Sequence, residues 1–299
     1  MITKEYRPKM FREVAGQDIN KKILQAIVRE PAKAPRSLIF QGEYGTGKTT
    51  CARIFARALN CKQNNGEACG RCENCLKDFD ESPFYFEYDA GMMGNTEDIK
   101  RLRETFYYGI SGGYKVIVLD ECHLASRQAQ SVLLKVLEES PDRVFFVFCT
   151  TNVNMLLPTI LSRSQELRFE KVSDVDMRAN LERIVEKEKL TPGPDILEII
   201  LRKAKGHARN AHMLLDRYIL QGEEEFRASV KSSEDLFLRF FMDVYRKDRE
   251  KAFATIDELL TFPLGEVLDD YQLTILDVTK ALVKETPMGN VDEDRKSVV

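Results

Sequence analysis

The chain has 299 residues, of which 43% are hydrophobic, so it can supply two or three domains with their own cores and is not a disordered protein. Its 45 basic and 48 acidic residues give a net charge of −3, which neither supports nor excludes DNA as a partner. The sequence shows no apolar signal region and no run of about 20 apolar residues to cross a bilayer, so we expect a cytoplasmic protein without a membrane partner.

A phosphate-binding loop directly follows a short apolar run at 37–41, which predicts a buried strand. The loop places glycines at its first, fourth and sixth positions, where they let backbone N–H groups approach an anion. Lys48 then points its ammonium at the outer phosphates, Thr49 offers a hydroxyl to Mg²⁺, and the following helix directs its positive end at the bound charge. The residues expected to contact the nucleotide are Gly42, Gly45, Thr46, Gly47, Lys48, Thr49 and Thr50.

Four closely spaced cysteines follow this helix, namely Cys61, Cys69, Cys72 and Cys75. Thiolates at this spacing can converge tetrahedrally on one Zn²⁺ at about 2.3 Å each, which leaves no position for water and makes the site structural. The alternatives are reduced thiols in a flexible loop, or a redox pair. The other cysteines, Cys51, Cys122 and Cys149, lie in apolar or helical stretches and are interpreted as buried small side chains.

A second acidic element follows the β-branched run at 115–119, which also predicts a buried strand. Asp120 can help to hold Mg²⁺, and Glu121 can orient and deprotonate the water that attacks a γ-phosphate. Two adjacent acids are by themselves typical of a solvated turn, but after a buried strand and a phosphate-binding loop they indicate hydrolysis. We interpret His123 as a surface or capping residue and assign it no chemistry.

A third apolar run, at 144–149, ends in two threonines, Thr150 and Thr151. Because side chains alternate along a strand, one of them should face the nucleotide and hydrogen-bond the γ-phosphate or the attacking water. With runs near 84–89 and 166–169, the pattern predicts an α/β fold with a five-stranded parallel sheet and helices on both faces. The site is then expected at the carboxyl ends of the strands.

From Ser173 onward the apolar spacing changes to a helical period, which predicts a small three-helix lid. A later helical stripe, either a domain core or a collar between subunits, consists of Leu264, Leu268, Tyr271, Ile275, Val278 and Leu282. We therefore predict three domains. They are a nucleotide-binding domain at 1–171 with a zinc insert at about 61–75, a lid at 172–225, and a helical collar domain at 226–299 with a frayed tail.

The order of these motifs resembles that of the ATPase subunits of DNA clamp loaders, and most of all the DNA polymerase III gamma/tau (DnaX) subunits, a branch of the AAA+ P-loop ATPases. The resemblance covers about residues 4 to 220. Besides the phosphate-binding loop, the cysteines and the acidic pair, it rests on Tyr6-Arg7-Pro8, Val14-Ala15-Gly16-Gln17, Thr150-Thr151-Asn152 and Leu161-Ser162-Arg163. Because the sequence ends soon after its third region, it looks like a short gamma-like or phage-encoded form.

The resemblance implies further site residues. Those that border the adenine and ribose are Tyr6, Arg7 and Pro8. Thr151 matches the sensor position of the third strand, and Arg209 looks like a second sensor contributed by the lid. Arg163 looks like an arginine finger that reaches the γ-phosphate of a neighbouring subunit, where a guanidinium stabilises the charge on a transferring phosphoryl group. For either arginine the alternative is a surface ion pair.

The implied function is ATP-driven loading of a ring-shaped sliding clamp onto primer-template DNA, with Mg²⁺ and a structural Zn²⁺ as cofactors. Implied partners are homologous and delta- or delta-prime-like clamp loader subunits, the clamp, and DNA read by shape through phosphate contacts, with Arg127 as a candidate contact. The alternatives are another AAA+ DNA motor of the branch-migration helicase type, a zinc-bearing P-loop nucleoside kinase, and an ATP-binding structural subunit that does not hydrolyse. The kinase would need an acceptor pocket and no arginine from a neighbour, and intact Lys48 and Glu121 count against the last.

Overall fold

The computed structural model describes residues 1–63, 65–92, 112–138, 143–230 and 233–260, together with 268, 271 and 275. The chain forms two compact units, Met1–Glu223 and Glu224–Val299. The boundary between them lies two residues before the one that the sequence predicts after residue 225. The predicted division between residues 171 and 172 falls inside the first unit and stays a prediction.

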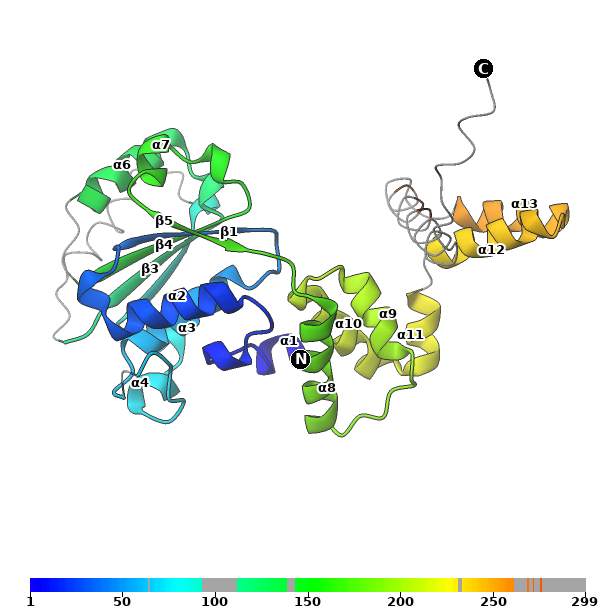
Figure 1. The fold of residues 1–299 in the computed structure, drawn as a ribbon, viewed down its shortest axis with the longest axis horizontal. Helices are drawn as coiled ribbons and strands as arrows, with labels where there is room; N and C mark the ends of the chain where they lie inside the picture. The colour runs from blue at the N-terminus through cyan, green and yellow to red at the C-terminus, as the bar shows by residue number, and fades with distance from the viewer. Residues whose placement is uncertain are drawn as a thin grey trace, which may run out of the picture. The chain divides into compact units, whose positions relative to one another are not determined.

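The first unit is built around a five-stranded parallel sheet with the order β2-β3-β4-β1-β5 (Figure 1). Its strands are β1 (Ser37–Gly42), β2 (Tyr85–Asp89), β3 (Lys115–Asp120), β4 (Val144–Thr150) and β5 (Gln165–Phe169). The sheet confirms the fold class and all five strands expected from the apolar runs. Gln41 lies opposite Thr150, and Leu119 lies opposite Phe148. This register brings the carboxyl ends of β1, β3 and β4 to one edge of the sheet.

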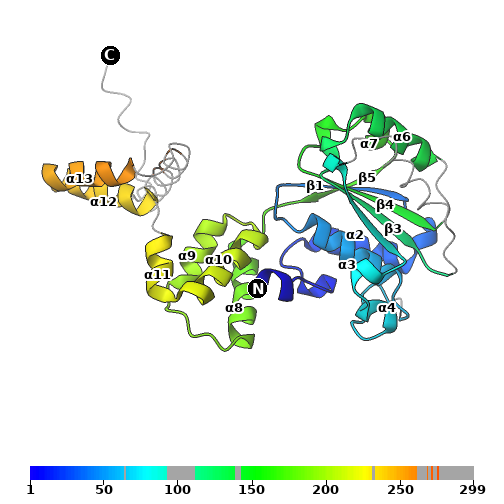
Figure 2. The ribbon, with the colours of Figure 1, turned by 180° about the vertical axis from the view of Figure 1, so that it is seen from behind.

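Helices cover both faces of the sheet (Figures 1 and 2). One face carries α2 (Asp18–Arg29) and α3 (Lys48–Leu59), and the other carries α6 (Arg127–Glu138) and α7 (Pro158–Leu161). Successive residues of a strand enter different cores. Phe40 packs in the same core as Phe55 of α3, whereas Ile39 packs with Leu133 of α6. Burial on both faces explains why the inner strands β1, β3 and β4 are almost continuously apolar, whereas the edge strands β2 and β5 alternate.

Short helices and turns join these elements. They are η1 (Phe11–Glu13), η2 (Pro31–Lys33), α4 (Glu73–Leu76), η3 (Phe79–Glu81), η4 (Ala90–Met92), η5 (Cys122–Leu124) and η6 (Val153–Met155). Three of them, η4, η5 and η6, follow the carboxyl ends of β2, β3 and β4. They therefore form part of the edge at which the site is expected.

Three helices follow the sheet in the first unit, α8 (Asp174–Lys187), α9 (Ile196–Ala204) and α10 (Ala208–Gln221). On α8, the side chains of Met177, Leu181 and Ile184 are buried, as their helical spacing predicts. The chain reverses between α9 and α10 at Lys205 and Gly206, both with positive φ. We refer to these three helices as the lid.

The amino terminus packs on the lid rather than on the sheet. Helix α1 (Ile2–Glu5) contacts α10, and the carboxylate of Asp216 accepts hydrogen bonds from the amide of Ile2 (2.6 Å) and the hydroxyl of Thr3 (2.8 Å). Close by, the hydroxyl of Tyr6 donates to Glu188 at the end of α8. The segment leading to Arg7 is therefore fixed to the lid, which neither periodicity nor spacing indicates.

The second unit contains α12 (Ser233–Tyr245) and α13 (Arg249–Leu259), and α11 (Glu223–Ser229) begins at the last residue of the first unit. Arg239 on α12 forms an ion pair with Glu258 on α13 at 2.7 Å. Of the predicted collar stripe, Leu264, Val278 and Leu282 lie outside the described residues, so that prediction stays untested. In the described part of the chain, no helix combines the length and the apolar content needed to span a membrane.

Candidate nucleotide-binding site

The phosphate-binding loop joins β1 to α3 in a wound conformation. Gly45 and Gly47 have φ of 77° and 99°, a region that side-chain-bearing residues rarely adopt. The ammonium of Lys48 is buried beneath the loop, where it donates to the carbonyl oxygens of Gly42 and Glu43 at 2.9 Å each. The lysine therefore closes the loop on itself and lies ready to exchange these carbonyls for phosphate oxygens.

Side chains of the loop itself and of a neighbouring segment hold this loop in place. The hydroxyl of Thr46 donates to the carbonyl of Glu43 at 2.8 Å. Gln17 has a left-handed backbone with φ of 58°, and its amide nitrogen donates to the carbonyls of Thr46 (3.4 Å) and Glu170 (2.6 Å). The segment containing Gln17 thus ties the loop to the strand end after β5.

The acidic pair lies directly beside the loop. The hydroxyl of Thr49, in the first turn of α3, donates to the carboxylate of Asp120 at 2.9 Å. Glu121 follows with a left-handed backbone, φ of 47°, and its amide donates to the other carboxylate oxygen of Asp120 at 3.1 Å. A hydroxyl and carboxylates at one point are the oxygen ligands that Mg²⁺ prefers. The residues present therefore fit the magnesium ion that the sequence predicts.

His123, to which the sequence analysis assigns no chemistry, lies among the candidate catalytic residues. Its Nδ1 is 3.4 Å from a carboxylate oxygen of Glu121 and 3.2 Å from the hydroxyl of Thr150, and its Nε2 is 3.5 Å from the hydroxyl of Thr151. Strict alternation would send the two threonines to opposite faces, but β4 ends at Thr150 and the chain bends at Thr151. Both hydroxyls consequently reach the same imidazole, the buried one on Nδ1 and the exposed one on Nε2.

Arg209 of the lid lies at the tip of the loop. The guanidinium of Arg209 lies 5.0 Å above the ring of Tyr44 and donates a hydrogen bond to its hydroxyl. Glu43 next to it is 3.3 Å from His207 and 3.2 Å from Lys171. Arg209 therefore lies at the phosphate-binding loop, where a lid sensor would have to act.

Arg7 approaches the loop from the amino terminus. Its Nε donates to the hydroxyl of Thr50 at 3.2 Å. Burial lowers the pKa of the Arg7 guanidinium, and the nearby positive charge of Arg53 lowers it further, with a smaller contribution from Arg209. Glu87, which forms an ion pair with Arg53 at 2.7 Å, opposes this shift, so part of the positive charge around Arg7 is already neutralised.

The neighbours of Arg7 are placed differently. Tyr6 is buried, with the ammonium of Lys187 4.7 Å above its ring, and its hydrogen bond to Glu188 raises the pKa of its hydroxyl to about 12. Pro8 is partly buried. The polar contacts of Tyr6 thus go to the lid, and its role beside the base stays a prediction.

Arg163 and Arg127 lie apart from the loop. Arg163 is 45% exposed and forms an ion pair with Glu138 of α6 at 3.0 Å, while it donates to the carbonyl of Thr159 of α7 at 3.2 Å. Arg127 is exposed at the first residue of α6, where the hydroxyl of Ser126 caps the helix through the amide of Ala129 at 3.2 Å. Among the described residues, the contacts of Arg163 are with α6 and α7. They include the surface ion pair named as the alternative, so its action on a neighbouring subunit stays a prediction.

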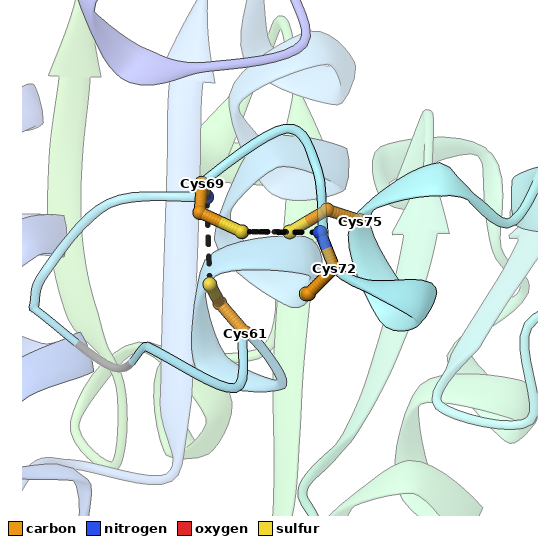
Figure 3. Close-up of side chains that lie close together, drawn as sticks. All are labelled: Cys61, Cys69, Cys72 and Cys75. Atoms are coloured by element: carbon orange, nitrogen blue, oxygen red, sulfur yellow. Dashed lines mark hydrogen bonds between the residues drawn. The ribbon is translucent and has the colours of Figure 1, made fainter.

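The four cysteines of the insert meet at one point between α3 and α4 (Figure 3). Their sulfur atoms all lie within 4.8 Å of one another, and those of Cys69 and Cys75 are 3.9 Å apart. Four Zn–S bonds of about 2.3 Å require sulfurs about 3.8 Å apart in a tetrahedron. Backbone hydrogen bonds, first that of Arg71, lower the pKa of Cys69 to about 6, which favours the thiolate that binds metal. The donor set therefore fits a structural Zn²⁺.

The insert is also joined to the amino-terminal segment. The carboxylate of Glu67 accepts hydrogen bonds from the amides of Phe11 (2.9 Å) and Arg12 (3.3 Å), at the start of η1. Ala68, next to it, is buried in the same core as Phe11. The cysteine cluster thus holds a short segment against the residues that lead to Gln17 and the phosphate-binding loop.

We predict that removing the metal unfolds the insert. Since so polar a segment buries few apolar groups, binding of the metal supplies its folding free energy. Cys72→Ser is expected to lower the zinc content from about one ion per chain to nearly none, measured by atomic emission, and to expose 61–75 to protease. Cys51→Ala, which removes a buried thiol outside the cluster, is the control and should retain the metal. Full zinc content in Cys72→Ser would contradict the site.

The remaining cysteines are buried, as the sequence predicts. Cys51, Cys122 and Cys149 are at most 1% exposed. Burial raises the pKa of the Cys51 and Cys122 thiols to about 12 and that of Cys149 well above its usual value. Thiols in this state are not nucleophiles.

The sheet order, the wound loop and the helical lid define an AAA+ P-loop ATPase fold. Consistent with this, the structure resembles that of a RuvB variant from Thermotoga maritima with a TM-score of 0.55, over 95% of this chain and 82% of that one. At 17% sequence identity, this likeness shows the fold alone.

Sequence comparison shows the family. A family model described as "DNA polymerase III, delta subunit" matches residues 16–173. DNA polymerase III subunit gamma/tau of Mycoplasma pneumoniae is 37% identical over 219 residues, which are 73% of this chain and 32% of that protein. DNA polymerase III subunit tau of Escherichia coli is 30% identical over 270 residues, 86% of this chain and 41% of that one. The chain therefore belongs to the clamp loader family of DNA polymerase III gamma/tau (DnaX) subunits, and it spans less than half the length of these relatives.

Proposed function

We propose that this chain is an ATPase subunit of a clamp loader, which uses ATP to place a ring-shaped sliding clamp on primer-template DNA. The observation that carries the proposal is the hydrogen bond between Thr49 and Asp120, with Glu121 adjacent, since it joins a phosphate-binding loop to a hydrolytic pair. Membership of the gamma/tau family supports a sliding clamp as the protein that is loaded. Its partners would be homologous and delta- or delta-prime-like subunits.

The chain's own residues would divide the work as follows. The loop amides and Lys48 bind the triphosphate, and Thr49 with Asp120 holds Mg²⁺, which neutralises phosphate charge when bound. Glu121 takes a proton from the attacking water. Arg209, on α10 of the lid, couples the binding of nucleotide in the loop to the position of the lid. Arg163 completes the nucleotide site of the neighbouring subunit. Hydrolysis then depends on assembly, and the difference in affinity between ATP and ADP states releases the clamp.

The chain would recognise the shape of the DNA backbone and not its base sequence. With a net charge of −3, binding has to come from a local set of backbone amides and basic side chains directed at phosphates. Arg127, exposed at the start of α6, is our candidate side chain for such a contact.

The deciding experiment measures the steady-state ATPase rate of the assembled loader with no addition, with a bacterial sliding clamp, with primed DNA, and with both. We expect the highest rate with both together. Stimulation by branched DNA without any need for the clamp would instead favour a branch-migration type of motor. The absence of turnover in all four settings, with ATP still bound, would favour a structural subunit.

Glu121→Gln is expected to leave ATP bound and to lower the turnover number by about 100- to 10,000-fold, the usual contribution of a general base. The amide keeps the size of the side chain but cannot accept the proton. Nucleotide affinity is measured by calorimetry, and turnover by phosphate release. Glu166→Gln, an exposed glutamate on β5, is the matched control and should behave as the parent chain. Continued hydrolysis in Glu121→Gln would move the base elsewhere.

A further inference from the structure

His123 faces the candidate base and the candidate sensor at the same time, although its own side chain is only 13% exposed. Its two ring nitrogens differ in their neighbours. Nδ1 faces the carboxylate of Glu121 and the hydroxyl of Thr150, whereas Nε2 faces the hydroxyl of Thr151. The ring therefore spans the ends of β3 and β4.

The neighbours of Nδ1 determine where the proton of a neutral ring lies. The carboxylate of Glu121, 3.4 Å from Nδ1, can only accept a hydrogen bond, so its charge favours the ring proton on Nδ1. Nε2 is then an acceptor, to which the hydroxyl of Thr151 donates a hydrogen bond at 3.5 Å. Thr150 is compatible with this tautomer, because its oxygen can accept from Nδ1 at 3.2 Å and share the proton with Glu121, as it accepts from the amide of Asn152 at 3.0 Å.

We propose that His123 is a positioning residue for ATP hydrolysis, which orients Glu121 through Nδ1 and sets the hydrogen-bond direction of Thr151 through Nε2. The inference rests on the proposed ATPase function. Because the hydroxyl of Thr151 donates its one hydrogen bond to His123, its oxygen can only accept from other partners, as the carboxylate of Glu121 does. Two acceptors held by one ring suit the two hydrogens of a water molecule, whereas a phosphate oxygen needs donors. The sensor threonine thus pairs with the attacking water rather than with the γ-phosphate.

The left-handed backbone of Glu121 makes such a support necessary. A residue with φ of 47° at the end of β3 is in a sparsely populated conformation. Its side chain is 28% exposed, and its contact with His123 connects it to Thr150 at the end of β4. Without that contact the carboxylate is free to turn toward solvent.

The test replaces His123 by three residues that keep different parts of the ring. Asparagine places an amide where Nδ1 lies, glutamine places one where Nε2 lies, and alanine keeps neither. His123→Ala is expected to lower the turnover number by up to about 100-fold, the cost of an ångström-scale misplacement of a catalytic group. The affinity for ATP should stay unchanged. His123→Asn should recover most of the rate, and His123→Gln should recover less.

Three results would overturn the proposal: an unchanged turnover number in His123→Ala, a weakened ATP affinity that explains the whole loss, or rescue by glutamine but not by asparagine. A further control combines His123→Ala with Glu121→Gln. Because the histidine acts partly through the glutamate and partly through Thr151, its removal should slow Glu121→Gln by a smaller factor than it slows the parent chain, and an equal factor in both backgrounds would contradict the inference. The midpoint of thermal unfolding checks that each variant is folded.

A second measurement does not depend on hydrolysis or on a clamp. Nitrogen NMR of the chain labelled at its 3 histidines distinguishes the two neutral ring forms, and the His123→Asn spectrum identifies the signal. We expect the proton on Nδ1 in the parent chain and its transfer toward Nε2 in Glu121→Ala. A proton on Nε2 in the parent chain, alone or together with one on Nδ1, would overturn the proposed direction. If the parent chain hydrolyses ATP but loads no clamp, the proposed function fails and this inference stands.

Discussion

Lys48→Ala is expected to lower the affinity for ATP by about 100- to 10,000-fold. The estimate comes from two hydrogen bonds of a charged donor, each worth about 1.5–3 kcal/mol. In the present structure the ammonium donates these two hydrogen bonds to the carbonyl oxygens of Gly42 and Glu43. Phosphate oxygens would accept the same bonds, and alanine can make neither.

The affinity is measured by calorimetric titration of the chain with ATP and Mg²⁺. Because Lys48 is buried, its removal also changes the packing of the loop, so the thermal unfolding midpoint is recorded alongside. Lys22→Ala removes an exposed lysine of α2 and should bind ATP as the parent chain does. Unchanged affinity in a folded Lys48→Ala chain would remove the nucleotide site from this loop.

Local chemistry in the sequence was sufficient to predict the sheet and the centre of the site. The central strands β3 and β4 are apolar runs that end at a polar residue, and parallel strands bring those ends to one edge. The contact between Thr49 and Asp120 follows from that rule alone, although 71 positions separate the two residues. The cysteine cluster could also be predicted from spacing, because four thiols so close in sequence can all reach one metal ion.

Contacts between single side chains on distant elements could not be predicted in this way. Nothing in the sequence joins Glu67 to the amide of Phe11, or Ile2 to Asp216, because neither pair has a period or a motif. His123 was assigned no role for the same reason, since a lone histidine shows no ligand spacing. Arg209 was placed at the loop only by family resemblance, and the structure supplies its contact with Tyr44.

Arg163→Ala is expected to leave the ATP affinity of the isolated chain unchanged and to lower hydrolysis in the assembled loader by about a thousandfold or more, the range of an arginine finger. Its present partner does not hinder that role. An ion pair between half-exposed side chains such as Arg163 and Glu138 contributes about 0–1 kcal/mol. The arginine can therefore leave α6 for a neighbouring γ-phosphate at little cost.

Mixing two inactive variants distinguishes action on a neighbour from action on the same chain. A Lys48→Ala subunit binds no ATP but retains Arg163, and an Arg163→Ala subunit binds ATP but lacks the finger. Placed side by side, they form one complete site, so a loader reconstituted from the mixture should recover part of the ATPase rate. Arg168→Ala, an exposed arginine on β5, should remain active by itself. If the mixture stays as inactive as its components, or if Arg163→Ala slows the isolated chain as much as the assembly, Arg163 does not act on a neighbouring subunit.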